Sequence, residues 1–555
     1  MNDKDNKEQG LSRRGFITTA AIGSAATFYL SGAKLTAFAS EQSSKQRNLN
    51  ADPLPSNSKP TKWDDTTDVV VVGGGSSGLA AAVSAAETGA KVIVVEKNPF
   101  CGGDSQFASA FGTAGGPVAS RFVRKQGVPC PPISEHVKAE LTGPDATGGK
   151  SPALVRTIIE HQAETLDWLE DLGVRYASGP VFGLPPGVVH VPIDPEHPDG
   201  GWYRWHPHTA RGFTQALEKR ARSLAITFLT ETPAIGLVTE GNQVIGITAQ
   251  PVNAKPIHIK AASVVLTTGG FGANKDMLQK YLPPRRIAAY RYWGLPSATG
   301  DGIRMAEAIG AEITAMDEAE IWDGGALHDF GPHGAYTTPN QLVRQKSLTV
   351  NKLGQRFFDE SLYAGLFYSY QAAQTIAQLD HTSFTLFDSN CISKEDIIKK
   401  FEPEICEYPC PWWDEQFQKY VEDGTIMKSD SIRGLARKME VDPASLEETI
   451  VRYNACCDKG VDSEFFKEAK YLHAIKKPPF YAVKQFGGSL FETYGGLIVD
   501  NRFHVLNKKR QAIPGLYVAG QNAAFGTNLA FALPGGHLAG RFAAEDALGK
   551  GPRTA

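Results

Sequence analysis

Residues Asp68–Gly103 read DVVVVGGGSSGLAAAVSAAETGAKVIVVEKNPFCGG, and this stretch decides the fold. The aliphatic run Val69–Val72 is typical of a parallel strand that is buried on both faces. A glycine-rich turn follows, then a small-residue helix over Leu79–Thr88 and a second aliphatic strand over Val92–Val95. The order strand, glycine turn, helix, strand predicts a βαβ unit that opens a doubly wound α/β domain.

The glycines of this unit are spaced as GxGxxG, at Gly73, Gly75 and Gly78. The first permits a tight turn, the second lets the backbone approach a pyrophosphate, and the third permits close packing of helix and strand. The helix N-terminus then faces the anion with unpaired N–H groups. Glu96 ends the second strand, where a carboxylate accepts hydrogen bonds from ribose hydroxyls. The alternative is a glycine-rich turn in an ordinary α/β domain.

Distant segments extend this pattern along the chain. Together with the first unit, Val264–Gly272 (VVLTTGGFG), Thr493–Asp500 (TYGGLIVD) and Ile513–Gly520 (IPGLYVAG) resemble the fumarate reductase/succinate dehydrogenase flavoprotein superfamily. That superfamily includes soluble fumarate and urocanate reductases and 3-ketosteroid dehydrogenases. TGDGIRMAEAIGA from Thr299 and VNKLGQRFFDE from Val350 extend the match. The resemblance implies FAD rather than NAD, and a Rossmann-like FAD-binding domain interrupted by an inserted α+β cap domain.

The resemblance also implies a set of FAD-binding residues and a noncovalent flavin. Relatives with covalent FAD carry a histidine shortly after the GG pair, whereas Asp104 and Ser105 follow Gly103 here. The last strand continues with Gln521 where a glutamate is usual. The expected cofactor-binding residues are Gly73, Gly75, Ser77, Gly78, Glu96, Lys97, Gly103, Asp104, Ser105, Gly269, Gly270, Asp301, Gly520, Gln521, Gly535 and Leu538.

Length and composition set further bounds. A chain of 555 residues is long enough for two domains, and a net charge of −3 without a basic stripe argues against nucleic acid as a partner. None of the seven cysteines lies in a CxxCH haem motif. Cys406 and Cys410 form a C-x3-C pair that is compatible with a disulfide, a cluster ligand or scattered structural thiols. We predict no metal site.

The N-terminus has the features of an export signal. Ser12–Ile17 reads SRRGFI, a twin-arginine motif, and an apolar stretch and Ala37-Phe38-Ala39 follow it. A short amphipathic anchor is the alternative. We expect export by the twin-arginine translocase to a bacterial periplasm or cell-wall space, where NAD(P)H is absent. Electrons must then come from a membrane quinol system or a separate redox carrier.

The motifs divide the chain into segments. We expect a signal peptide over residues 1–39, a polar linker over 40–64 and the first part of the FAD domain over 65–283. The cap should follow over 284–474 and the second part of the FAD domain over 475–550. Leu154–Leu172 has apolar residues at helical spacing and is expected to pack on the sheet.

The positions that bind carboxylates in soluble fumarate reductases are not matched. No arginine follows Arg356–Glu360 closely, Glu492 replaces the histidine before T-x-GG, and Asn522–His537 contains no arginine. Fumarate is therefore not the expected substrate. Tyr363 lies near the place where ketosteroid dehydrogenases carry a tyrosine. It is either a proton donor or base, or part of an aromatic cluster with Phe358, Phe367 and Tyr368.

Other candidates for the substrate site are less defined. In FALPGGHLAG, Gly535 or Gly536 resembles the glycine whose N–H polarises the ketone in the steroid enzymes, or else these glycines only start a helix against FAD. Arg344 is either a carboxylate ligand or an exposed cap residue. Thr493 and His537 are further candidates, and His206 and His208 are weaker ones. Four aromatic residues either line a substrate pocket or belong to the core: Trp202, Trp205, Tyr292 and Trp293.

The function we predict is an exported FAD-dependent reductase of a C=C bond conjugated to a carbonyl. Its substrate is a small molecule, an enone or an unsaturated acid other than fumarate. The alternative with the same fold is a 3-ketosteroid dehydrogenase that works in the oxidative direction. The alternative of another class is a flavin electron-transfer subunit, against which a large cap domain argues.

Overall fold

The computed structural model of the chain divides into two units, Met1–Arg47 and Asn48–Ala555. The structure describes only residues of the second unit. The expected signal peptide and most of the linker lie outside the described residues. These are 60–107, 111–113, 132–142, 151–174, 176–177, 188–192, 211–283, 290–292, 294–324, 346–363, 368–391, 417–418, 420–524 and 529–551.

An eight-stranded sheet forms the first layer, in the order β18-β19-β9-β1-β2-β6, with β8 paired to β9 and β7 to β8. Neighbours in the run from β19 to β6 are parallel, as the βαβ pattern predicts. The strands are β1 (Asp65–Val72), β2 (Val92–Val95), β6 (Thr227–Leu229), β7 (Ala234–Glu240), β8 (Gln243–Ala249), β9 (Ile257–Leu266), β18 (His504–Leu506) and β19 (Ala512–Val518).

The aliphatic run on β1 lies at the centre of this sheet. Val69 pairs with Val92 on one side, and Val72 pairs with Leu266 on the other. Residues Val69–Val72 are at most 2% exposed. Such a strand needs cover on both faces, and the predicted buried parallel strand is confirmed.

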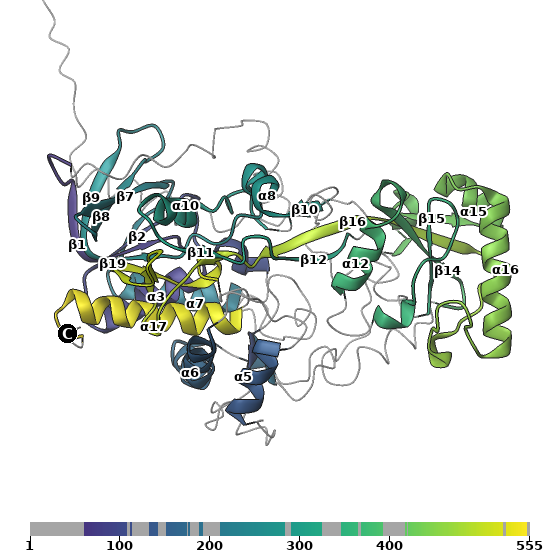
Figure 1. The fold of residues 1–555 in the computed structure, drawn as a ribbon, viewed down its shortest axis with the longest axis horizontal. Coiled ribbons are helices and arrows are strands. Elements are labelled where there is room, and N and C mark those ends of the chain that lie inside the picture. Colours follow the sequence, from purple (N-terminus) through teal and green to yellow (C-terminus); the bar gives the residue numbers. More distant parts are fainter. Residues whose placement is uncertain are drawn as a thin grey trace, which may run out of the picture. The chain divides into compact units, whose positions relative to one another are not determined.

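Helices α3 (Ser76–Glu87) and α17 (Leu529–Ala547) lie side by side against the sheet (Figure 1). A Cβ at Gly536 would collide with the backbone of Ser77, and a Cβ at Gly540 would collide with that of Ala81. The two glycines are one helical turn apart and therefore share the face that meets α3. Their small size permits this close approach.

Helix α6 (Pro152–Asp171) is where the sequence predicts a helix, but it packs against α17 and α5 (Ile133–Thr142) rather than on the sheet. That part of the prediction is wrong, because α17 already covers this face.

Pro534 interrupts the hydrogen bonding of α17. Because proline has no N–H group, the carbonyl of Ala530 lacks its usual partner within the helix. The Gln162 amide of α6 donates to that carbonyl instead, at 3.0 Å. Helix α7 (Arg211–Ser223) packs against α3.

A second, six-stranded sheet is built around β16, which pairs with β10, β12, β14 and β15, while β13 pairs with β14. Because β16 lies beyond residue 474, this sheet extends past the expected domain boundary. Helices α12 and α15 pack on it, and α16 packs against α15. The elements are β10 (Tyr290–Tyr292), β12 (Ala319–Gly324), β13 (Leu348–Asn351), α12 (Tyr368–Ile376), β14 (Thr382–Asp388), β15 (Ile426–Ser429), α15 (Ile432–Met439), α16 (Pro443–Lys459) and β16 (Phe480–Thr493).

Shorter elements complete the described chain. They comprise two small sheets, further α-helices and single 3-10 turns: η1 (Gly103–Phe107), β3 (Phe111–Thr113), β4 (Tyr176–Ala177), β5 (Val188–Pro192), α8 (Lys275–Tyr281), α10 (Asp301–Ala308), β11 (Ile313–Thr314), η4 (Glu360–Tyr363), η5 (Leu379–His381), η6 (Ala469–Tyr471), β17 (Gly496–Leu497) and η7 (Gly520–Asn522). None of the helices in the described ranges is long and apolar enough to cross a membrane.

Candidate flavin and substrate site

The site lies where the parallel strands of the first sheet end. Gly73 follows β1, Glu96 follows β2, Thr267 follows β9, and Ala519 follows β19. Parallel neighbours place their carboxyl ends at one edge of the sheet, and ligands of doubly wound folds bind outside this edge. Segments that are distant in sequence therefore converge on one place.

The glycine turn has the geometry that a bound pyrophosphate requires. Gly73 has a φ of +105°, and a side chain there would collide with the carbonyl of Thr267. A Cβ on Gly75 would meet only the carbonyl oxygen of Gly102, at 4.0 Å, so the backbone of Gly75 is open to a ligand. A Cβ on Gly78 would collide with the carbonyl of Gly73, which explains the third glycine of the motif.

The N-terminus of α3 lies beside the glycine pair Gly102–Gly103. The N–H of Gly102 donates to the carbonyl of Gly74 at 2.8 Å, and a Cβ on Gly103 would lie 3.3 Å from Gly75 Cα. Ser105 Oγ donates to Ser76 Oγ at 2.7 Å. Because Gly75 has no side chain to cap α3, backbone N–H groups of the first turn are available to an anion. These residues fit the pyrophosphate of FAD.

Glu96 is held at the base of the glycine turn. Its Oε2 accepts the N–H of Gly74 at 2.7 Å, and its Oε1 accepts the backbone and side-chain N–H groups of Asn98 at 2.7 and 2.8 Å. Burial raises the pKa of the Glu96 carboxyl, and these hydrogen bonds oppose the shift. The carboxylate therefore lies at the end of β2, where the sequence predicts a ribose ligand.

Three other expected FAD-binding residues are bonded to neighbouring segments. Lys97 Nζ lies 2.7 Å from Asp301 Oδ2 and donates to Thr299. Asp104 accepts the N–H of Leu295 at 2.6 Å and the hydroxyl of Tyr292. In this structure Lys97, Asp301 and Asp104 thus join the end of β2 and the GG turn to the chain before α10.

The turn after β9 is held by η7. Asn522 Oδ1 accepts the N–H of Gly269 at 3.0 Å, and its Nδ2 donates to Thr268 Oγ1 at 2.9 Å. Gly269 has a φ of +79°, and no described atom lies within 4 Å of a Cβ built there. A side chain at Gly520 would collide with Ser77 of α3. No local sequence pattern marks Asn522, because its role depends on two turns that only the fold brings together.

Glu492 and Thr493 end β16 and meet the same turn. Thr493 Oγ1 accepts the N–H of Phe271 at 3.1 Å. Gln521 Nε2 donates to Glu492 Oε2 at 2.8 Å, and Gln521 Oε1 lies 3.4 Å from the N–H of Gly270. Glu492 is only 4% exposed. The structure thus brings a buried carboxylate from the second sheet to the edge where the strands of the first sheet end.

The PGG segment lies inside α17. Gly536 is past the first turn of this helix, where N–H groups pair within the helix, and it contacts Ser77. Gly536 therefore has a packing role, and the predicted contact between its N–H and a substrate ketone stays a prediction. Gly535 and Leu538 are buried in the same helix. Their contacts with FAD also stay predictions.

His537 is also buried in α17, with its ring 4.2 Å from that of Trp168. Burial lowers the pKa of His537 to about 4, so the imidazole is neutral at pH 7. Its Nδ1 has no hydrogen-bond partner among the described residues.

Tyr363 ends η4, and its backbone alone is described. The turn is anchored by a buried ion pair, in which Arg356 Nη2 lies 2.7 Å from Glu360 Oε2 and Arg356 Nη1 lies 2.7 Å from Asp462 Oδ2. The other candidates, Arg344, Trp202, Trp205, His206, His208 and Trp293, lie outside the described residues, as do Cys130, Cys406 and Cys410. Cys101, Cys391, Cys456 and Cys457 are free thiols.

At the ends of the parallel strands lie a glycine turn, a helix N-terminus and a carboxylate placed to bind a ribose. This arrangement defines a dinucleotide-binding α/β protein. A family model described as the FAD binding domain matches residues 68–538. The chain belongs to this family of FAD-dependent oxidoreductases, and its cofactor is FAD.

Several characterised proteins are similar to the chain. It is 30% identical over 375 residues to NADH:acrylate oxidoreductase of Vibrio harveyi, covering 66% of this chain and 34% of that protein. It is 28% identical over 502 residues to vinyl phenol reductase of Lactiplantibacillus plantarum, covering 83% of this chain and 93% of that protein. The open conformation of a flavocytochrome c3 fumarate reductase superposes with a TM-score of 0.70 at 26% identity, covering 88% of this chain and 79% of that one.

Proposed function

We propose that the protein is an exported reductase that adds hydrogen across a C=C bond conjugated to a carbonyl group. The substrate class is an enone or an unsaturated acid other than fumarate. This substrate class is inferred from the buried carboxylate of Glu492 at the edge of the flavin site. Relatives that are named as reductases of acrylate and of vinyl phenol support reduction of a C=C bond.

The residues at the strand ends would hold FAD without a covalent bond. The first turn of α3 and Gly102–Gly103 would bind the pyrophosphate, and Glu96 would bind the adenosine ribose. Asn522 and Gln521 fix the turn at Gly269–Gly270 beside the place where the flavin would lie. When bound, the flavin supplies hydride exchange with a carbon of the substrate.

Glu492 would select against dicarboxylates. A second carboxylate on the substrate would meet a negative group of the protein in a water-poor environment, where like charges repel more strongly than in water. A neutral hydrogen-bond donor on the substrate would instead be accepted by the Glu492 oxygens. This electrostatic preference supports an enone or a monocarboxylate over fumarate.

Tyr363 would transfer the proton to the carbon next to the one that receives the hydride. A phenol can donate a proton to an enolate carbon, and no arginine is available at the matching position of the sequence. The ion pair between Arg356 and Glu360 would keep η4, and with it Tyr363, in place.

The twin-arginine motif supports export of the folded, FAD-loaded protein. Outside the cytoplasm, electrons would reach the flavin from a membrane quinol system or a separate redox carrier. The matched region covers only 34% of NADH:acrylate oxidoreductase, so that protein's use of NADH is not carried over to this chain.

One experiment tests the substrate class. The purified flavoprotein is reduced anaerobically, and flavin reoxidation is followed with fumarate, urocanate, cinnamate, acrylate, 4-vinylphenol and a 3-keto-4-ene steroid. We expect reoxidation by at least one enone or monocarboxylate and slow reoxidation by fumarate. Reoxidation by fumarate alone would contradict the proposal. No reoxidation by any acceptor, together with flavin reduction by a saturated ketosteroid, would identify a dehydrogenase.

A further inference from the structure

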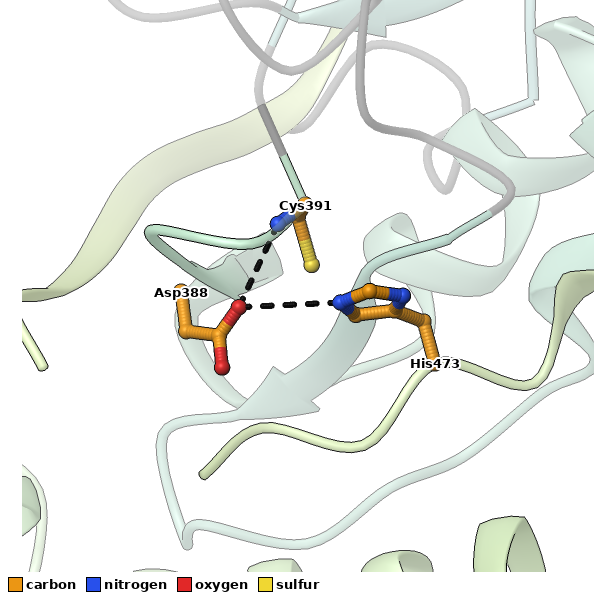
Figure 2. A group of neighbouring side chains, drawn as sticks. All are labelled: Asp388, Cys391 and His473. Carbon is orange, nitrogen blue, oxygen red and sulfur yellow. Dashed lines mark hydrogen bonds and ion pairs between the residues drawn. The ribbon is translucent and has the colours of Figure 1, made fainter. Parts of the chain in front are cut away.

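Three side chains that can bind a metal ion converge at one end of the second sheet (Figure 2). Asp388 is the last residue of β14, Cys391 follows it closely, and His473 comes from the segment after η6. Their ligand atoms all lie within 4.8 Å of one another. Asp388 and Cys391 are buried. None of these residues takes part in the flavin site.

The carboxylate of Asp388 is fixed by backbone N–H groups. Its Oδ1 accepts from Asn390 and Cys391 at 2.9 and 3.2 Å, and its Oδ2 accepts from Lys476 and Lys477 at 2.9 and 2.8 Å. These bonds hold the carboxylate in one orientation, and among the described residues no lysine or arginine side chain forms an ion pair with it. Outer hydrogen bonds of this kind orient carboxylate ligands in metal sites.

His473 points its Nε2 at this carboxylate without forming a hydrogen bond. The distance from Nε2 to Asp388 Oδ1 is 3.7 Å, which is too long for a hydrogen bond. Nε2 is buried and has no hydrogen-bond partner among the described residues. Bond lengths of about 2.0–2.3 Å around a tetrahedral zinc ion place its ligand atoms about 3.3–3.8 Å apart. The observed spacing is therefore close to that of two ligands of one ion.

Cys391 supplies a soft third ligand. Its Sγ lies 3.9 Å from the carbonyl oxygen of Lys346, a weak contact. On coordination, the thiol would release its proton and bind as a thiolate. A thiolate and a carboxylate together balance the charge of a divalent ion.

We propose that Asp388, Cys391 and His473 bind one divalent zinc-type ion, with solvent as the fourth ligand. The combination of imidazole, thiolate and carboxylate suits Zn²⁺ better than Mg²⁺ or Ca²⁺. The His473 side chain is 28% exposed, so the cluster lies near the protein surface although its ligand atoms are buried. The ion would fasten the segment that contains His473 to the end of β14. It has a structural role, remote from the flavin chemistry.

The test measures binding of cobalt and zinc to the FAD-loaded protein. Cobalt replaces zinc, and its tetrahedral d–d bands appear at longer wavelengths than flavin absorption. We expect one cobalt ion per chain with such bands, displacement by zinc, and at least tenfold weaker binding in His473→Gln. His473→Gln alters only the long contact of 3.7 Å with Asp388, so its fold should persist, and an unchanged flavin content checks this. Cys391→Ser should abolish the bands.

His381→Gln is the matched control, because this histidine contacts only a backbone carbonyl among its recorded polar contacts, and it should bind cobalt as the wild type does. Absence of tetrahedral cobalt bands in the wild type at micromolar free metal would overturn the proposal. Binding that survives in both His473→Gln and Cys391→Ser would also overturn it, since the ion would then belong to other cysteines.

Discussion

At the scale of single residues, we expect Glu492 to decide which acceptors the site favours. It replaces a histidine that binds carboxylate in the resembled fumarate reductases, and it is buried beside Gln521. Glu492→His should speed flavin reoxidation by fumarate at least tenfold, which corresponds to about 1.4 kcal/mol of relieved repulsion. Stopped-flow absorbance at the flavin band measures the rate.

Glu447→Gln is the control for this change, because it removes a charge of the same sign from exposed α16, where Glu447 pairs with Arg433. Its reoxidation rates should equal those of the wild type. An unchanged fumarate rate in Glu492→His would show that Glu492 does not select the substrate.

The second prediction for a single residue concerns Tyr363. If its phenol donates the proton, Tyr363→Phe should lower turnover by roughly 10²–10⁴-fold while flavin content stays the same. The measurement is steady-state reduction of the best acceptor from the panel. Full turnover in Tyr363→Phe would remove Tyr363 from the reaction.

Residue roles were predictable where local backbone geometry decides them. Gly73, Gly75 and Gly78 have the conformations and close approaches that GxGxxG requires. Asn522 and Gln162 could not be selected, because each bonds a backbone group more than 200 residues away in the sequence. Such pairs depend on the tertiary fold and leave no local pattern.

At the scale of elements, α17 depends on α6 because Pro534 interrupts its hydrogen bonding. Gln162 is 1% exposed and donates to the freed carbonyl of Ala530 at 3.0 Å. Gln162→Leu should leave that carbonyl buried and unpaired and lower the free energy of unfolding by about 1–3 kcal/mol. Thermal and urea unfolding of the FAD-loaded protein measure the change.

Thr165→Val on the same helix provides the comparison, because Thr165 bonds only the carbonyl of His161 in its own helix among its recorded contacts. We expect a smaller loss there. Equal losses in both variants would mean that the bond between Gln162 and α17 has no special role.

The hairpin of β18 and β19 is joined to α17 through His504. His504 Nδ1 lies 2.9 Å from Asp500 Oδ2, and its Nε2 lies 3.0 Å from the Tyr517 hydroxyl and 3.2 Å from Asp546 Oδ2. Burial lowers the pKa of His504, but the contacts with the two carboxylates outweigh burial and raise the pKa above the ordinary 6.5. The folded state therefore holds this proton more tightly than the unfolded state does.

The stabilisation from His504 is fully present below pH 6.5 and is lost as the pH rises through the folded-state pKa. The melting temperature of His504→Asn should therefore fall less than that of the wild type as the pH increases from 6.5 upward. Differential scanning calorimetry across this range makes the comparison. The control is His258→Asn, since His258 contacts a threonine hydroxyl. Parallel pH profiles for wild type and His504→Asn would contradict the assignment.

For the whole molecule, the sequence predicted the first sheet better than the second. The βαβ unit and the return strand IPGLYVAG lie where expected, because buried parallel strands are short aliphatic runs. The cap domain was expected to end at residue 474, whereas the central strand of the second sheet is the 14-residue β16, which begins at Phe480. That strand carries glycines and polar residues and ends in the motif that marks the flavin site, so its sequence pattern did not show to which sheet it belongs.

The central claim, that this protein reduces an activated C=C bond, is tested most directly by a single turnover without oxygen. The fully reduced flavoprotein is mixed with less than one equivalent of the best enone or monocarboxylate acceptor, and flavin absorbance and product mass are measured together. We expect one flavin to be reoxidised for each molecule of saturated product formed. Flavin reoxidation without a saturated product, or reoxidation by fumarate alone, would contradict it.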